Sequence, residues 1–382
     1  MRLLHTSDWH LGRSFHREDL LAAQEAYVDH LVDVVRAESV EAVLISGDLF
    51  DRALPPVTAV SLAGEALRRI ADTGARVIAI SGNHDSPRRL GFAAELIAAS
   101  GVHLRTDITT IARPVVLDDE HGSIAVYALP YLEPDLVASA LDVTERGHTA
   151  VLTAAMEHVR ADLAARPRTR SVVLAHAFVS GAECSDSERD ITVGGVASVP
   201  VTTFAGVDYA ALGHLHGRQT LGDGLRYSGS PLAYSFSEVG QSKGGWLVEL
   251  DARGLHSVSA VDAPVPRAIA RLRGRLDDLL TSREYTSYEG HWLHVTLTDP
   301  TRPVEPMERL RARFPHTLVL GFEPDGVVTD DASSYAERIF GRSDLDVATD
   351  FVTHVRQRPA SEAERALLDE AFAAARAAEV AV

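Results

Sequence analysis

Five short polar motifs, each closing a hydrophobic run, constrain this chain more than any other feature of its sequence. Their candidate ligand residues are Asp8 and His10 in LLHTSDWHLG, Asp48 in VLISGDLFD, Asn83 and His84 in VIAISGNHD, His176 in VVLAHAF, and His214 and His216 in YAALGHLHG. One such residue after a strand is more often a cap or a turn residue than a ligand, but the whole set indicates a metal site. Carboxylate, amide oxygen and neutral imidazole together suit Mn²⁺, Fe²⁺ or Zn²⁺ better than Ca²⁺ or Mg²⁺ alone. Gly47, Gly82 and Gly213 each precede a candidate ligand, so we expect each to allow a sharp turn that directs the next side chain inward.

The hydrophobic runs alternate with amphipathic stretches, which predicts an α/β fold. Residues 18–38 and 57–72 have helical periodicity, and short strands are predicted at 2–6, 42–46, 76–81, 124–129, 171–175 and 209–212. Further strands are expected within residues 227–250. Open α/β sheets place their sites beyond the carboxyl ends of the strands, which is where the five motifs fall.

Composition limits the class of protein. The 382 residues suffice for two or three domains, and 46% hydrophobic with 24% charged residues is ordinary for a soluble globular protein. The one cysteine, Cys184, cannot form an internal disulfide, which favours a reducing compartment. No apolar run reaches membrane-spanning length, and the first motif begins too early to leave room for a signal peptide. We therefore expect a soluble cytoplasmic protein with no membrane association.

The formal net charge of −17 argues against a protein that coats DNA, because sequence-independent DNA affinity comes mainly from Lys and Arg contacts with phosphates. It does not exclude a nuclease. Several acidic residues would lie beside divalent cations that reverse the local sign, and a partner subunit can carry DNA contacts. Lys243 is the only lysine, so nearly all the positive charge is arginine.

The order D-x-H, G-D-x-x-D, G-N-H-D, a single His and G-H-x-H resembles the calcineurin-like metallophosphoesterase superfamily, whose signature has these pieces in this order. Further stretches resemble the SbcD family, the nuclease subunits of bacterial SbcCD complexes that process DNA ends and hairpins: LLHTSDWHLGRSFH, SDSERDITVGGVASVP, DYAALGHLHGRQ, and RYSGSPLAYSFSE with SKGGWLVEL. This resemblance implies a sandwich of two mixed sheets flanked by helices, a small α+β capping domain and a C-terminal helical segment.

The superfamily pattern also implies a role for each candidate ligand. Asp48 would bridge two divalent ions, expected to be Mn²⁺, because a carboxylate readily bridges such a pair. The implied ligand sets are Asp8, His10 and His216 for one ion, and Asn83, His176 and His214 for the other. His84 resembles the family's catalytic histidine, which protonates the leaving 3′ oxygen or stabilises the transition state. Asp51 and Asp85 are expected to orient histidines or to cap the following helix.

A change in pattern near residue 263 predicts a domain boundary. Pro264 and Pro266 in DAPVPRAIARL indicate a linker, so we expect a nuclease domain at residues 1–262. Residues 263–340 contain HWLHVTLTD, PVEPMERLRARF and HTLVLGFE in strand, helix, strand order, and by resemblance they form a capping domain that shapes the DNA-binding cleft. Six of its arginines either contact DNA phosphates or lie on a solvated surface: Arg271, Arg273, Arg275, Arg309, Arg311 and Arg313.

Residues 341–382 are expected to form two amphipathic helices separated at Pro359, with a capping box of Ser361 and Glu364 at the start of the second. Their apolar stripes are Leu345, Ala348, Phe351, Val352 and Val355 in the first helix, and Leu367, Leu368, Ala371, Phe372 and Ala375 in the second. The stripes either pack on their own domain or, as the resemblance to SbcD implies, bind the coiled-coil base of the ATPase partner SbcC.

Other polar residues near the motifs have simpler interpretations. His5 lies in a predicted strand and His30 on a predicted helix, so both are expected to be ordinary hydrogen-bonded residues rather than ligands. For His16, we favour a structural role over a contact with DNA. Arg189 and Asp190, in the SbcD-like stretch SERDITVGG, either line a DNA cleft or form an internal loop salt bridge.

The sequence therefore predicts a Mn²⁺-dependent DNA nuclease subunit for DNA repair, recombination and replication. By resemblance it has 3′ to 5′ exonuclease activity on duplex ends and endonuclease activity on single strands and hairpins. We expect a homodimer within a heterotetramer with an SbcC-type ATPase, which must supply any ATP dependence because no G-x-x-x-x-G-K-[ST] motif occurs. The alternatives are a phosphatase or cyclic-nucleotide phosphodiesterase with the same dimetal core, and a non-catalytic scaffold subunit of the same fold.

Overall fold

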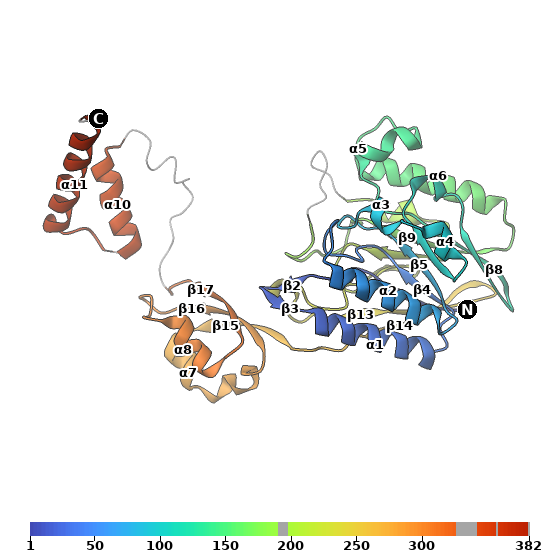
Figure 1. Cartoon of the computed structure of the whole chain (residues 1–382), viewed down its shortest axis with the longest axis horizontal. Helices are drawn as coiled ribbons and strands as arrows, with labels where there is room; N and C mark the ends of the chain where they lie inside the picture. Colours follow the sequence, from blue (N-terminus) through green and yellow to red (C-terminus); the bar gives the residue numbers. More distant parts are fainter. Residues whose placement is uncertain (190–197, 326–341, 357, 381–382) are drawn as a thin grey trace. The chain divides into compact units, whose positions relative to one another are not determined.

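The computed structural model describes residues 1–189, 198–325, 342–356 and 358–380. The chain forms two compact units, Met1–Glu323 and Pro324–Val382. Two six-stranded sheets and a three-stranded sheet lie in the first unit, and the second contains a pair of helices (Figure 1). Within the described ranges, no helix is long and apolar enough to cross a membrane.

The first six-stranded sheet has four parallel strands at its centre and one edge. Its strand order is β14 (Gly254–Asp262), β13 (Gly244–Asp251), β1 (Arg2–Thr6), β4 (Ala42–Ile45), β5 (Arg76–Ile80) and β6 (Val102–Arg105). β1, β4, β5 and β6 are parallel, whereas β13 and β14 are antiparallel additions at the other edge. The helices α1 (Leu21–Ala37) and α2 (Val57–Ala71) cover its outer face (Figure 1).

The second six-stranded sheet is parallel at its centre and antiparallel at both edges. Its order is β11 (Gln219–Gly222), β12 (Leu225–Tyr227), β10 (Tyr209–Gly213), β9 (Arg170–His176), β8 (Gly122–Ala128) and β7 (Val115–Asp119). The helix α6 (His148–Ala164) covers the outer face of this sheet, with the one-turn α5 (Pro134–Val137) beside it.

The two sheets pack face to face because their strands are apolar on both sides. Leu4 and Val43 point toward α1 and α2, whereas the neighbouring Leu3 and Leu44 point into the layer between the sheets, where they meet β8, β9 and β10. Strands buried on both faces read as continuous hydrophobic runs, which is why their positions are visible in the sequence. The expected sandwich of two mixed sheets flanked by helices is confirmed.

A third, smaller sheet follows the linker that contains Pro264 and Pro266. It is a parallel β-α-β-α-β unit with its own core: β15 (Ile269–Gly274), α7 (Leu276–Thr281), β16 (Trp292–Leu297), α8 (Pro306–Arg313) and β17 (Thr317–Phe322). The expected strand, helix and strand are present, and they are preceded by strand β15 and helix α7, which were not predicted from the sequence. We call residues 263–323 the capping part.

The first long helix begins later than residue 18, where helical periodicity was expected to begin. Residues 18 and 19 instead form β3 (Glu18–Asp19), which pairs with β2 (Ser14–Phe15) in a small hairpin. Asp19 Oδ1 accepts a hydrogen bond from the backbone N–H of Leu21 at 2.8 Å, so a side chain outside the helix satisfies a donor of its first turn. The remaining short elements are α3 (Pro87–Leu90), α4 (Ala94–Ala98), and 3₁₀ turns η1 (Ile108–Thr110), η2 (Ala138–Leu141), η3 (Val201–Phe204), η4 (Phe236–Glu238) and η5 (Arg283–Tyr288).

The second unit contains the two expected helices, α10 (Asp344–Arg356) and α11 (Glu362–Val380). The predicted capping box is present, because Glu364 N donates to Ser361 Oγ at 3.3 Å and Ser361 N donates to Glu364 Oε2 at 2.8 Å. Of the predicted apolar stripes, Ala375 lies outside the residues whose side chains are described. No side chain of α10 is buried, and Phe351 is 55% exposed.

Candidate metal centre

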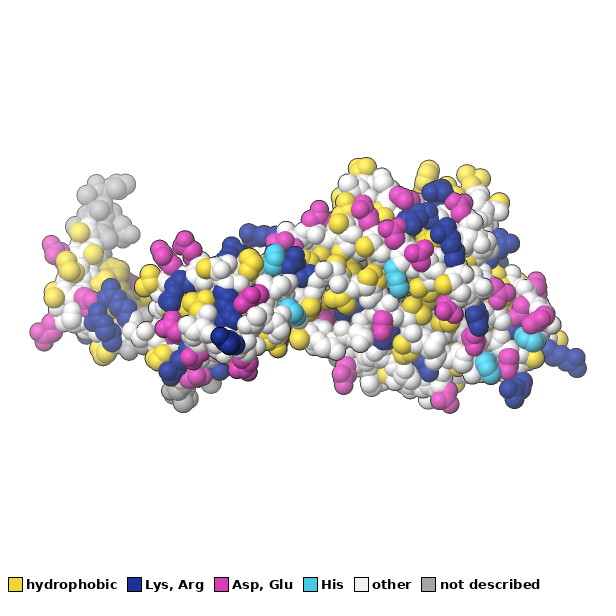
Figure 2. Space-filling model, turned by 90° about the horizontal axis from the view of Figure 1, so that it is seen from below, with side chains coloured by type: hydrophobic (Ala, Val, Ile, Leu, Met, Phe, Trp, Pro, Cys, Tyr) yellow, Lys and Arg dark blue, Asp and Glu magenta, His cyan; other side chains and the backbone are white. Residues whose placement is uncertain are grey.

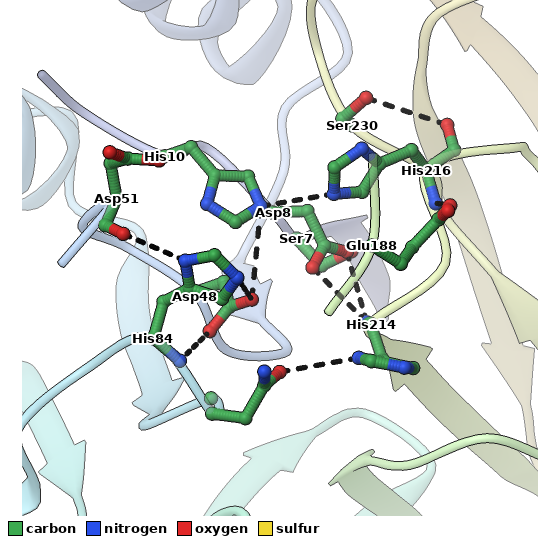
Figure 3. A network of polar contacts seen from close by, with 12 residues as sticks. Ser7, Asp8, His10, Asp48, Asp51, His84, Glu188, His214, His216 and Ser230 are labelled. Carbon is green, nitrogen blue, oxygen red and sulfur yellow. Dashed lines mark hydrogen bonds and ion pairs between the residues drawn. The ribbon is translucent and has the colours of Figure 1, made fainter. Parts of the chain in front are cut away.

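The candidate ligands of the five motifs meet at one edge of the sandwich. They follow the carboxyl ends of β1, β4 and β5 in one sheet and of β9 and β10 in the other. Figure 3 shows His10, Asp48, His84 and His216 directed toward a common centre, although they come from different loops. Asn83 is half-buried, and the other candidates are buried: Asp8, His10, Asp48, His84, His176, His214 and His216.

Asp48 lies in the middle of this cluster. Its Oδ2 is 3.7 Å from His10 Nε2, 3.5 Å from His176 Nε2 and 3.9 Å from His84 Nε2. Ligand atoms in three overlapping groups lie within 4.8 Å of one another: Asp8 with His10 and His216, Asp8 with Asp48 and His176, and His10 with Asp48 and His84. Asp8, His10 and Asp48 each belong to two of these groups, and Asp48 Oδ2 is the carboxylate oxygen that lies within 4 Å of three histidine nitrogens.

Four of these residues adopt a backbone conformation that side chains other than glycine disfavour. The φ angles are 53° at Asp8, 45° at His10, 49° at Asp48 and 104° at His214. Each such residue costs about 1–3 kcal/mol and persists only where the surroundings impose it. Here the conformation is imposed by backbone hydrogen bonds between the loop after β1 and the loop after β4. Asp8 N donates to Gly47 O and His10 N donates to Asp48 O, both at 3.0 Å. Such strain concentrates at functional sites.

The three glycines of the motifs are needed for two different reasons. Gly47 has φ of 95°, so it makes the expected turn. Gly82 and Gly213 do not adopt a positive φ, so the backbone freedom of glycine is not what these two positions require. A Cβ at Gly82 would lie 2.2 Å from Asp48 Oδ1, and one at Gly213 would lie 2.0 Å from Ser46 O. These two glycines therefore make room for close approach of the loops.

The donor atoms of the cluster suit divalent cations. His10 Nε2 and His216 Nε2 lie 3.0 Å apart, and at most one neutral ring of such a pair can donate a hydrogen to the other. Asn83 Oδ1 lies 2.8 Å from His176 Nε2 and 3.2 Å from His214 Nδ1. The centre is thus lined by lone pairs and two carboxylates, which is a set that metals bound by imidazole and carboxylate take.

Burial shapes the protonation of the cluster. It raises the pKa of Asp8 to about 6 and lowers the pKa values of His10 and His214 well below the ordinary value. Burial also acts to lower the pKa of His176, but the Asp48 carboxylate more than offsets it and brings this pKa to about 9. Protons and cations therefore compete for the same atoms.

The two acids expected to orient histidines act differently. His84 Nδ1 donates to the backbone carbonyl of Asp51 at 2.7 Å, so the Asp51 carboxylate is not the group that orients the ring. Asp85 neither contacts a histidine nor caps α3; its carboxylate accepts backbone N–H groups of Leu49, Phe50 and Gly82 at 3.2, 2.9 and 3.0 Å. Asp85 thus ties the loop after β4 to the loop after β5 and fixes the spacing of Asp48 and His84.

A group of polar residues around His216 was not predicted from the sequence. His216 Nδ1 lies 2.6 Å from Ser187 Oγ and 3.4 Å from Glu238 Oε1, and Glu188 Oε1 accepts from His216 N at 2.8 Å. Lys243 forms an ion pair with Glu238. The signal that marks them is their position in the SbcD-like stretches SDSERD, SFSE and SKGG.

The residues interpreted as structural lie outside the cluster. His5 hydrogen-bonds Tyr209 Oη at 2.9 Å and Leu212 O at 3.1 Å in the buried layer between the sheets, as expected of a core histidine. The His16 ring packs 5.0 Å from Phe236, which favours its structural role. Arg189 is exposed, and Asp190 lies outside the described residues.

Family comparison agrees with the geometry. The sequence model of the family described as Calcineurin-like phosphoesterase matches residues 1–218, more than half of the chain, and the chain therefore belongs to this family of metal-dependent phosphoesterases. A second model, SbcD_C, described as Type 5 capsule protein repressor C-terminal domain, matches residues 265–356. Within the family the chain is therefore SbcD-like, as the sequence motifs predicted.

Solved structures align with much of the chain at low identity. A protein from Thermus thermophilus is 11% identical, with 68% of this chain and 98% of that chain covered and a TM-score of 0.38. The anchor protein GAP50 of the Plasmodium inner membrane complex is 11% identical, with 85% and 98% covered and a TM-score of 0.38. A dimetal phosphatase from Danio rerio is 13% identical, with 69% and 99% covered and a TM-score of 0.38.

Proposed function

We propose that this protein is a dimetal DNA nuclease subunit that acts with an SbcC-type ATPase in DNA end processing. It hydrolyses DNA phosphodiesters as a 3′ to 5′ exonuclease on duplex ends and as an endonuclease on single strands and hairpins. One observation carries the proposal: a buried phosphoesterase ligand cluster and an SbcD-type C-terminal region occur on the same chain. The proposed domains are nuclease at 1–262, capping at 263–340 and helical at 341–382.

The residues of the cluster divide into two ligand sets that share Asp48. Asp8, His10 and His216 would hold one cation, and Asn83, His176 and His214 the other. When bound, two divalent cations, proposed to be Mn²⁺, neutralise charge on the phosphate and make water a better nucleophile. Asp8 and Asp48 supply the negative charge that such a pair requires at a buried site.

His84 is the proposed catalytic residue. The carbonyl of Asp51 accepts its Nδ1–H, which fixes the ring plane and leaves Nε2 facing the centre. In the imidazolium form, which carries a second proton at Nε2, the ring can pass that proton to the leaving 3′ oxygen or stabilise the charge on the phosphate. The Asp85 carboxylate and the backbone N–H of His84 join the two loops independently of the His84 ring, so we expect substitution of His84 to leave the loops in place.

On the face drawn in Figure 2, basic and acidic side chains are interspersed, so DNA phosphates on this face would meet single arginines rather than a broad basic surface. Ion pairs within the capping part hold three of the six candidate arginines: Arg309 with Asp277 at 2.7 Å, Arg313 with Glu289 at 3.0 Å, and Arg273 with Glu323 at 3.9 Å. Arg271 supports a DNA contact better. It is half-exposed, and its ion pair with the exposed Asp186, at 3.8 Å, places it beside the loop that carries Ser187 to the metal centre.

Two exposed apolar surfaces support the proposed partners. In the helical tail, Phe351, Val355 and Leu367 are 55%, 61% and 66% exposed, which suits docking on the coiled-coil base of SbcC. The other surface supports a homodimer, since apolar side chains exposed together mark interaction sites. This surface includes α2, the loop before it, and the region of α3. The Arg89 side chain of α3 donates a hydrogen bond to Ala53 O of that loop at 3.1 Å. The exposed apolar side chains of the surface are Leu54, Val57, Val60, Phe92 and Leu96.

Activity on two substrates tests the proposal. The purified chain with Mn²⁺ should cleave a labelled DNA hairpin and hydrolyse a small phosphate monoester far more slowly, and a chelator should abolish both reactions. Cleavage of the ester alone would make the protein a phosphatase. Two bound ions with no cleavage of either substrate would make it a scaffold. Addition of SbcC and ATP should stimulate digestion of duplex ends.

A further inference from the structure

A buried chain of polar side chains ends on His216. Ser187, Glu238 and Lys243 are 9%, 1% and 8% exposed, and they lie within 29, 22 and 27 residues of His216 in sequence. Ser187 Oγ is 2.6 Å from both His216 Nδ1 and Glu238 Oε1, and Glu238 is ion-paired with Lys243. The proposed chemistry gives none of these three residues a role.

The directions of the hydrogen bonds in this chain assign the tautomer of His216. The ionised carboxylate of Glu238 only accepts hydrogen bonds, so Ser187 must donate to it. The hydroxyl then has a lone pair but no hydrogen for His216 Nδ1, and Nδ1 must carry the hydrogen of the bond. Glu238 Oε1 itself, 3.4 Å from Nδ1, requires the same. His216 Nε2 is therefore the nitrogen with a free lone pair, and it faces His10 Nε2 at 3.0 Å.

Lys243, the only lysine of the chain, contacts both His216 and Glu238. Its Nζ donates to the backbone carbonyl of His216 at 2.9 Å while its charge balances Glu238. The backbone N–H of Tyr234 adds bonds of 3.2 Å to both oxygens of the same carboxylate. Because a buried carboxylate needs such compensation, Lys243 allows Glu238 to remain ionised and to act only as an acceptor.

Two other histidine rings of the centre are oriented by hydrogen bonds to backbone carbonyls rather than to side chains. His176 Nδ1 lies 2.9 Å from Ser46 O, and His84 Nδ1 lies 2.7 Å from Asp51 O. Backbone carbonyls are set by the fold and do not change with side-chain substitution. Among these three rings, only the orientation of His216 can be changed by substituting the residues that hold it.

We propose that Ser187, Glu238 and Lys243 are positioning residues that hold His216 in the Nδ1–H tautomer with Nε2 toward the centre, and so set the affinity of one of the two cation sites. The proposal rests on the proposed function, because it concerns the site of Asp8, His10 and His216. Substitution of the hydrogen-bond partner of a ligating histidine typically weakens metal binding about 10–100-fold. The site of Asn83, His176 and His214 should keep its affinity.

The tautomer is measured first, on the full chain without added metal. Nitrogen-15 NMR of the histidine side chains should show His216 protonated at Nδ1 in the wild type and a mixture of tautomers in Glu238→Gln, because an amide at this position can donate as well as accept. An unchanged spectrum of His216 in Glu238→Gln would overturn the proposal. This readout does not require metal binding, so it tests the network even if the protein proves to bind no Mn²⁺, the result that would refute the proposed function.

The effect on cation affinity is tested by titration with Mn²⁺, monitored by electron paramagnetic resonance. In Glu238→Gln one of two binding events should weaken about 10–100-fold and the other should stay unchanged. Loss of both, or of neither, contradicts selective positioning. Because Glu238→Gln leaves Lys243 buried without its partner, the double variant Glu238→Gln/Lys243→Met removes both charges and protects folding; its weak site should not recover.

A matched control removes an equally buried ion pair elsewhere. Arg170 and Asp119 are 5% and 7% exposed, and they lie beside the amino group of Met1, at the end of β1 opposite to Asp8. Asp119→Asn should destabilise the fold without changing either Mn²⁺ affinity. If this control weakens one site as Glu238→Gln does, the effect comes from general destabilisation and the positioning role is wrong.

Discussion

The metal centre and the helical tail invert the usual distribution of side chains in opposite ways. At the centre, Asp8 and His10 are fully buried although both are polar, whereas in the tail Phe351 and Leu367 are 55% and 66% exposed although both are apolar. Buried polar side chains and exposed apolar side chains are the informative exceptions in a protein. A buried polar group has lost its contact with water, and an exposed apolar group is in unfavourable contact with water. We therefore expect chemistry and assembly to occupy separate parts of this chain, so that each can be altered without the other.

The largest effect is expected from Asp48→Ala at the centre. The carboxylate lies within 4 Å of three imidazole nitrogens, so its removal should leave two cations without a shared anion. Cleavage should fall below detection, and elemental analysis should find fewer than two ions per chain. Retention of two ions per chain in the variant would refute the bridging role.

His84→Ala should reduce turnover without loss of metal. A general acid typically contributes about 10²–10⁴-fold to the rate, and we expect a decrease in this range with both ions and DNA affinity retained. Single-turnover cleavage of a labelled hairpin together with metal analysis measures both quantities. His30→Ala, on the outer helix α1, is the matched control and should cleave at the wild-type rate. A His84 variant that loses an ion would show that His84 is a ligand.

Asp119→Asn should lower stability and leave the chemistry intact. The Arg170 guanidinium beside Asp119 holds the pKa of this carboxyl far below its usual range, so the pair stabilises the fold above the unfolded pKa of about 3.9 and loses this contribution as the pH falls. Urea denaturation at pH 7 should show a loss of about 3 kcal/mol, and the difference from wild type should narrow below about pH 4. Glu364→Gln, in the exposed tail, should not change the global unfolding transition. Equal stabilities of the Asp119 variant and wild type at pH 7 would contradict the account.

The smallest effect on the core is expected when the chain ends after Arg342. Every proposed ligand precedes Arg218, so Mn²⁺-dependent cleavage of single-stranded DNA by the isolated subunit should remain. Association with SbcC and ATP-stimulated digestion of duplex ends should be lost. Size-exclusion chromatography with SbcC measures the first, and co-elution at wild-type affinity would place the interface elsewhere. Unfolding of the shortened chain would show that the tail packs on its own protein.

The sheets could be located from the sequence because their strands are buried on both faces. The run at residues 2–6 is β1, and the runs near residues 42, 76, 171 and 209 are β4, β5, β9 and β10 within one or two residues. Prediction failed at residues 18 and 19, which were expected to begin the first helix. They form β3 instead, because they pair with β2. It also missed β15 and α7, since their apolar residues are few and interleaved with charged ones.

The polar residues that meet at the centre can be predicted from the chain alone, because the order and spacing of Asp8, Asp48, His84 and His216 specify which polar groups come after which strands. How those residues are held depends on the folded molecule. Ser187, Glu238 and Lys243 reach His216 through loops whose paths depend on the packing of both sheets, and the left-handed backbone of Asp48 arises from contacts between loops. Local sequence specifies strands through burial patterns that repeat over a few residues, whereas a hydrogen bond between distant side chains depends on where the completed fold brings them together.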